Sequence, residues 1–304
     1  MLLRLPLPLE DDALRDLDIE CMAPPGIDIE FTIAPGRLDA RFAKPSSATI
    51  TIGARTAFTA CARAPDPSPE PLSRADFELY TRPSEGLVRI SPRIRALAAR
   101  LAGDERNAWA ALQRYWNFLL DDLTCGVVDY GTLDAARPLD QVLEAGWFDC
   151  QLGSALLVAL CRTGGIPARI VSGYLLYTAS PSYHWWAEVW LADRGWIPLD
   201  TICSDLSARG RDAPWRDYFM GQLDYRMKTE CLPRLFSRSP GLRLPAAWRM
   251  LARADGEATE IGLYDCKTGA PIYRDRIVVR HGAEACRDAA DSDGAASRVN
   301  ANPL

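Results

Sequence analysis

Three side chains in the sequence have the chemical types of a thiol-dependent catalytic site, namely Cys150, His184 and Asp200. A thiol attacks a carbonyl carbon as its thiolate, and both a helix N-terminus and a neighbouring imidazolium favour that form. A carboxylate that accepts a hydrogen bond from one imidazole nitrogen leaves the other nitrogen facing the thiol. The three residues could therefore act as nucleophile, proton carrier and orienting acid.

Each of these residues also has a simpler interpretation. A single cysteine is most often an inert buried thiol, and we interpret the other eight cysteines in that way. A lone histidine can be a satisfied core residue, and Asp200 could be a turn or capping residue. Spacing alone leaves these alternatives open. The assignment depends on whether the elements of the fold bring the three side chains together.

The segments around these residues predict one helix followed by an antiparallel sheet. Residues 149–163 are rich in Leu and Ala, begin with an acidic residue and stop at a Gly-Gly pair, which predicts a buried helix with Cys150 in its first turn. Strands are predicted after it, over residues 166–177, 183–191 and 196–200. This order favours an α+β fold, with the nucleophile helix packed on an antiparallel sheet.

The hairpin over residues 183–200 sets a geometric condition on the site. If residues 192–195 form a symmetric turn, Leu191 pairs with Trp196, and Asp200 then falls on the opposite face of the sheet from His184. We therefore expect a one-residue slip in this hairpin. Its expected place is a bulge at Pro198, which cannot donate to a strand ladder.

The rest of the chain predicts smaller parts around this core. Two helices are expected before it, over 91–103 and 104–124, the second with an aromatic stripe. The expected domains are an N-terminal β-rich domain with a proline-rich linker (1–71), the catalytic core (72–246), a small C-terminal β segment (247–281) and a disordered tail (282–304).

The stretch from Gly146 to Asp200 resembles the core motif of the transglutaminase-like superfamily, whose members share a papain-like Cys-His-Asp arrangement. The matching pieces occur in the family's order: Cys150 on its helix, Gly165-Ile166-Pro167-Ala168-Arg169, Gly173-Tyr174, His184 with Trp186, Glu188 and Val189, then Gly195-Trp196 and Asp200. The resemblance implies a bacterial-type cysteine protease or acyltransferase. It implies Cys150 as nucleophile, His184 as general base and then acid, and Asp200 as the residue that orients the imidazole.

The resemblance also implies an oxyanion site. One donor would be the backbone N–H of Cys150, and the second an upstream side chain, for which Tyr130 and Trp116 are the candidates. The aromatic stripe that carries Trp116 is, on its spacing alone, better explained as core.

The sequence departs from the family pattern next to the nucleophile and the histidine. Gly146 stands four residues before Cys150, where the family usually has glycine two residues before it, and bulky side chains lie between them. We expect four aromatic residues to shape the substrate pocket: Trp147, Phe148, Trp185 and Trp186.

Composition excludes several other classes of function. The formal net charge of -5 and a pI near 5.3 argue against a nucleic-acid partner. No stretch reaches the ~18 apolar residues of a membrane span, and the N-terminus lacks a secretory pattern, so we expect no membrane partner and a cytoplasmic location. Nine cysteines without paired spacing and only two histidines predict neither a metal nor a cofactor.

The expected reaction passes through an acyl-thioester on Cys150, formed from a peptide or a small acyl or amide substrate. Hydrolysis is the favoured outcome, because water is always available and its exclusion needs a dedicated lid. Transfer of the acyl group to an amine is the alternative. A third interpretation is a non-catalytic interaction module with the same fold, in which one member of the triad would commonly be missing.

Overall fold

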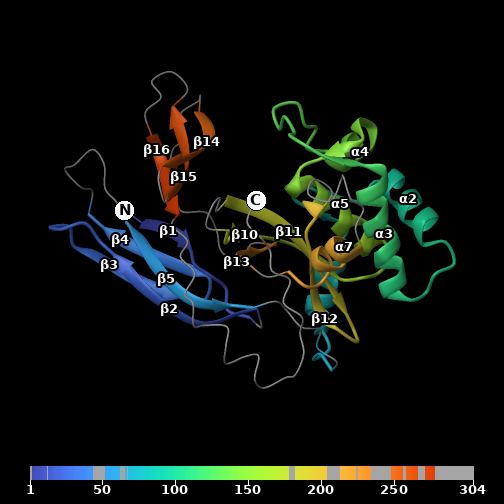
Figure 1. Cartoon of the computed structure of the whole chain (residues 1–304), viewed down its shortest axis with the longest axis horizontal. Helices are drawn as coiled ribbons and strands as arrows, with labels where there is room; N and C mark the ends of the chain where they lie inside the picture. The colour runs from blue at the N-terminus through green and yellow to red at the C-terminus, as the bar shows by residue number, and fades with distance from the viewer. Residues whose placement is uncertain are drawn as a thin grey trace.

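The computed structural model describes residues 2–11, 13–43, 52–61, 66, 68–177, 182–203, 213–223, 225–233, 248–255, 258–265 and 271–277. Figure 1 shows three parts: an N-terminal β domain, a core in which helices pack against a sheet, and a small C-terminal sheet. The fold is α+β, as the sequence predicts. The residues of the expected tail, 282–304, lie outside the described residues.

The core sheet has four antiparallel strands in the order β12-β11-β10-β13. Three of them occur where the sequence predicts strands, and the fourth, β13, was not expected. Their bounds are β10 Ala168–Leu175, β11 Ser182–Leu191, β12 Gly195–Leu199 and β13 Arg226–Cys231.

Helix α5 (Cys150–Thr163) is the centre of the core. Every residue from Leu152 to Arg162 is buried, as expected of a helix that is apolar on nearly all sides. It contacts β11 and β10 on one side, and further helices surround it (Figure 1). These helices are α2 Pro92–Ala102, α3 Ala108–Asp122 and α4 Pro138–Ala145.

The ends of these helices follow local capping rules. Ser91 caps α2, with Pro92 in the first turn, and Gly103 ends it with a positive φ of 55°. Helix α3 begins later than the predicted residue 104, because Asn107 supplies the cap by accepting from the backbone N–H of Ala110 at 3.0 Å. Capping side chains therefore fix the positions of both helices.

Gly146 ends α4 in the left-handed conformation, with a φ of 77°. The chain then forms β9 (Trp147–Phe148), which pairs in parallel with β8 (Thr124–Cys125) and leads into α5. The glycine four residues before Cys150 is thus a helix cap. The two residues after it form a short strand that directs the chain into the nucleophile helix.

The N-terminal domain consists of two small antiparallel sheets. One has the order β1-β4-β3 and the other pairs β2 with β5, the strands being β1 Leu2–Pro6, β2 Leu14–Met22, β3 Ile29–Ala34, β4 Arg37–Phe42 and β5 Gly53–Ala60. The domain touches the core sheet, because the backbone N–H of Leu9 donates to the carbonyl of Lys228 at 2.7 Å.

The remaining described elements are short. A C-terminal sheet has the order β14-β15-β16 (Trp248–Asp255, Ala258–Asp265 and Pro271–Ile277). The others are α1 Arg74–Thr81, β6 Ser84–Glu85, β7 Val88–Arg89 and α7 Ala213–Phe219.

Candidate active site

Cys150 is the first residue of α5. The helix begins there because the Asp149 carboxylate accepts from the backbone N–H of Leu152 at 2.9 Å, which satisfies one of the free donors of the first turn. The side chain of Cys150 is partly exposed. The positive end of the helix dipole lies at this residue.

His184 and Asp200 meet across the β11–β12 hairpin. The Nε2 atom of His184 lies 2.8 Å from Oδ1 and 2.9 Å from Oδ2 of Asp200. Both side chains are buried, with 5% of His184 and none of Asp200 exposed. A buried carboxylate in this position fixes the orientation of the imidazole ring.

The hairpin register explains how the two side chains come to share a face. Leu191 pairs with Gly195, so the loop has three residues, and Gly195 takes a positive φ of 70°. Continuing this register places Asp200 beside Trp186, on the face of the sheet that also carries His184. The expected one-residue slip is present, but its expected place is wrong. Pro198 pairs with Glu188 in unbroken register, and the loop makes the shift.

The charges of the pair stabilise each other. Burial alone would lower the pKa of His184, but the Asp200 carboxylate, together with a hydrogen bond to Cys150, raises it to about 9. Burial alone would raise the pKa of Asp200, but the neighbouring His184 and Arg226 cations lower it to about 2. The pair is therefore ionised at neutral pH. Because Nε2 faces Asp200, the Nδ1 side of the ring remains for the thiol.

Arg226 is a member of this cluster that the sequence did not reveal. Its Nη2 atom donates to Oδ2 of Asp200 at 2.7 Å, and only 7% of its side chain is exposed. It lies on β13 (Arg226–Cys231), a stretch for which no strand was predicted. The alternation of Arg226, Lys228 and Glu230 was the available signal, since a period of two is typical of a strand.

The family model of the transglutaminase-like superfamily matches residues 95–201, which contain Cys150, His184 and Asp200. This domain belongs to the transglutaminase-like superfamily. The search of curated proteins found no match.

Several solved structures are similar to the chain that carries this transglutaminase-like domain. A candidate cysteine protease from Cytophaga hutchinsonii is 18% identical, with 75% of this chain and 76% of that chain covered and a TM-score of 0.49. The periplasmic domain of TgpA from Pseudomonas aeruginosa is 18% identical, with coverage of 71% and 75% and a TM-score of 0.44. The red sea bream transglutaminase is 10% identical, with coverage of 92% and 72% and a TM-score of 0.33.

The two candidates for the second oxyanion donor lie in different surroundings. The hydroxyl of Tyr130 lies 3.0 Å from Oδ1 of Asp149 and 3.1 Å from Oε1 of Gln151, the two residues that flank Cys150. Its pKa is raised by burial of the hydroxyl, then by the charges of Asp149 and Cys150. Trp116 is 1% exposed inside the helical core of the transglutaminase-like domain. Only Tyr130 has a described interaction with the nucleophile.

The four expected pocket residues divide into two groups. Trp147 is 54% exposed, and Trp185 is partly exposed, packs against the hydrophobic core and lies on the opposite face of β11 from His184. Phe148 is completely buried and Trp186 is 2% exposed. Trp186 lies on the same face of β11 as His184, and Phe148 packs in the hydrophobic core, so both side chains leave little surface for contact with a substrate.

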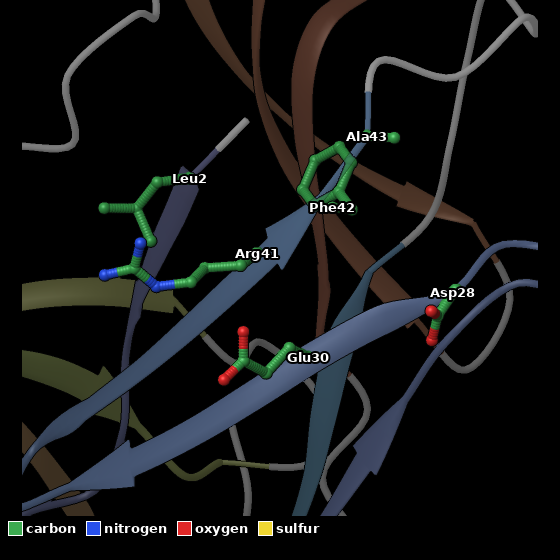
Figure 2. A pocket seen from close by; sticks show the side chains of 6 residues that line it. All are labelled: Leu2, Asp28, Glu30, Arg41, Phe42 and Ala43. Atoms are coloured by element: carbon green, nitrogen blue, oxygen red, sulfur yellow. The ribbon is translucent and has the colours of Figure 1, made fainter.

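Two hollows are found away from the thiol. An open one of about 520 Å³ lies in the N-terminal domain, and Figure 2 shows the side chains around it: Leu2, Asp28, Glu30, Arg41, Phe42 and Ala43. A second cavity, of about 30 Å³, is lined by residues that include Trp186, Glu188, Arg226 and Lys228. The second has room for a water molecule but not for a substrate.

Two negative findings concern the described residues only. They contain no group of three or more His, Cys, Asp or Glu side chains that could hold a metal ion. Within the same residues, no helix is both long and apolar enough to cross a membrane.

Proposed function

We propose that the chain is a cysteine hydrolase that cleaves an amide or peptide-like bond through an acyl-Cys150 intermediate. The observation that carries the proposal is the position of the His184 ring: Nε2 lies 2.8 and 2.9 Å from the two oxygens of Asp200, which leaves Nδ1 for the thiol, and Cys150 contributes to the raised pKa of the ring. This is the division of roles that a nucleophile, a proton carrier and an orienting acid require.

In the first step the thiolate of Cys150 attacks the carbonyl carbon, a carbon–sulfur bond forms, and the carbonyl oxygen becomes an oxyanion. The imidazolium of His184 then gives its proton to the leaving amine as the carbon–nitrogen bond breaks. In the second step a water oxygen attacks the thioester carbon while neutral His184 takes the water proton. The carbon–sulfur bond then breaks, the carboxylic acid leaves, and the Cys150 thiolate and the His184 imidazolium are restored.

The developing oxyanion needs donors close to the sulfur. The backbone N–H of Cys150 belongs to the first turn of α5, where no intrahelical partner uses it. We propose Tyr130 as the second donor, because its hydroxyl lies against the residues on both sides of Cys150. Loss of one such donor costs about 10²- to 10³-fold in rate.

Labelling with iodoacetamide at neutral pH, mapped cysteine by cysteine, tests the proposal. Cys150 should react faster than Cys21, whose pKa is raised by burial, and replacement His184→Ala should slow the labelling of Cys150 alone. His281→Gln is the matched control, because it removes the only other histidine. Slow labelling of Cys150 that His184→Ala leaves unchanged would contradict the proposal and favour a non-catalytic interaction module.

The second substrate is tested separately. A peptide-like acyl donor is offered with and without a high concentration of a primary amine, and the products are identified by mass spectrometry. Hydrolysis predicts acid as the main product in both cases. If an amide is the main product at high amine, the reaction is acyl transfer and not hydrolysis. The role of Cys150 as nucleophile would be the same in both cases.

A further inference from the structure

Asp200 is held from two sides. Its Oδ1 accepts from Nε2 of His184 at 2.8 Å and from the backbone N–H of Ile202 at 3.1 Å. Its Oδ2 accepts from Nη2 of Arg226 at 2.7 Å. A carboxylate bound on both oxygens cannot rotate away from the imidazole without losing a hydrogen bond to a charged group, which is among the stronger hydrogen bonds in proteins.

The position of Arg226 depends on a close approach between β13 and β10. A Cβ atom on Gly173 would lie 1.9 Å from the carbonyl oxygen of Met227, so only glycine allows the two strands to come together here. The pairing register shifts between Ser172 and Gly173. Gly173 also pairs with His184 on the other side of β10. The same glycine therefore sets the separation between the strands that carry His184 and Arg226.

The guanidinium itself is fixed in place. Its Nη1 lies 3.4 Å from the hydroxyl of Tyr177, and its central carbon is 5.8 Å from the centre of that ring. Tyr177 stacks on Tyr225, which has an unusual positive φ of 48°. Backbone strain of this kind persists only where the surrounding structure enforces it. The neighbours of Arg226 thus hold it against Asp200.

Titratable groups from several elements lie in and around the site. These groups are Cys150 from α5, His184 and Glu188 from β11, Arg226 and Lys228 from β13, Tyr177 from the segment after β10, and Asp11 from the N-terminal domain. Lys228 is occupied by Glu188 at 3.0 Å and by Asp11. Among these groups, Arg226 and His184 are the cations that contact Asp200.

We propose that Arg226 is a positioning residue of the active site, which holds Asp200 ionised and oriented so that His184 stays aligned with Cys150. This inference rests on the proposed function. Arg226 does not touch the reacting atoms and acts through Asp200. Without Arg226, burial is no longer offset by that cation, so Asp200 takes up a proton at a higher pH, and a neutral carboxyl no longer supports the imidazolium.

The test measures the rate of iodoacetamide labelling of Cys150 from pH 2 to pH 8 in wild type, Arg226→Met and Arg226→Lys, a range that includes the pKa of about 2 of Asp200 in the intact site. We expect Arg226→Met to move the acid limb of the profile upward by about one pH unit or more, since a neighbouring cation lowers a carboxyl pKa by roughly 1–3 units. Arg226→Lys keeps the charge and should restore most of the wild-type profile.

Two further variants separate positioning from folding. Arg162→Met removes another buried arginine, which pairs with Glu85 at 3.0 Å outside the site, and should lower stability without moving the acid limb. In protein that already carries Asp200→Asn, adding Arg226→Met should lower the labelling rate of Cys150 by less than about twofold. The reason is that Arg226 acts through the Asp200 carboxylate, which this background lacks.

An acid limb that is unchanged in Arg226→Met would overturn the inference. So would a double variant, Asp200→Asn with Arg226→Met, whose reduction in labelling rate equals the product of the reductions in the two single variants. These outcomes are distinct from failure of the proposed function, in which His184→Ala leaves the labelling of Cys150 unchanged in otherwise wild-type protein.

Discussion

The raised pKa of His184 predicts a specific pH dependence of stability. The imidazole binds its proton more tightly in the folded protein, with a pKa of about 9, than its ordinary value of 6.5. Its contribution to the free energy of unfolding is therefore fully present below about pH 6.5 and is lost as the pH rises through about 9. A difference of this size corresponds to about 3 kcal/mol, at about 1.4 kcal/mol for each pKa unit.

The matched variant is His184→Gln, which can still donate to Asp200 but does not titrate. Urea unfolding in the presence of a reductant, followed by the fluorescence of the nine tryptophans, gives the free energy of unfolding of both proteins at pH 6 and pH 10. The stability advantage of wild type over the variant should shrink by about 3 kcal/mol across this interval. An advantage that is the same at both pH values would refute the proposed ion pair.

Three further predictions concern packing around the site. Phe148→Ala should lower the free energy of unfolding by about 3–5 kcal/mol, because the ring is fully buried, while Trp147→Ala should change it by less than about 0.5 kcal/mol. Gly153→Ala should cost about 1–3 kcal/mol despite the better helix propensity of alanine, because a Cβ would lie 2.4 Å from the Phe148 ring. Lys228→Met should cost about 3 kcal/mol, because it removes a buried cation that pairs with Glu188. Urea unfolding at pH 7 measures all of them.

Each of these predictions has a control in the same chain. Gly126→Ala places a Cβ in open space and should leave the urea midpoint nearly unchanged. Arg74→Met breaks an exposed pair with Glu78 and should cost less than about 1 kcal/mol. Equal effects in a test variant and its control would show that burial and close packing do not determine these energies.

The elements that carry the nucleophile and the imidazole could be predicted from the sequence because their signals are local. Asp149 before an apolar run and a Gly-Gly pair after it define α5, and runs rich in β-branched and aromatic residues define β10 and β11. Strand β13 could not be predicted in this way, because its charged residues are buried only through partners on other strands. Such partners are visible only once the chain has folded.

In the candidate site, too, some features follow from local sequence signals and others depend on tertiary contacts. The types of Cys150, His184 and Asp200 and the family motif point to the cluster, and strand alternation shows that the hairpin needs a slip. Whether a bulge or a loop supplies that slip depends on the conformation of Gly195, which glycine permits but does not dictate. The burial of Phe148 and Trp186 depends on tertiary packing, so aromatic character alone could not tell pocket from core.

The formation of an acyl-enzyme on Cys150 is the most direct test of the central claim. Wild type, Cys150→Ser and His184→Gln proteins are mixed with p-nitrophenyl acetate, and acetylated peptides are mapped by mass spectrometry at successive times. The account predicts rapid acetylation of Cys150 in wild type, followed by loss of the acetyl group to water, and much slower acetylation in His184→Gln. Acetyl groups spread evenly over the exposed cysteines, at the same rate with or without His184, would contradict it.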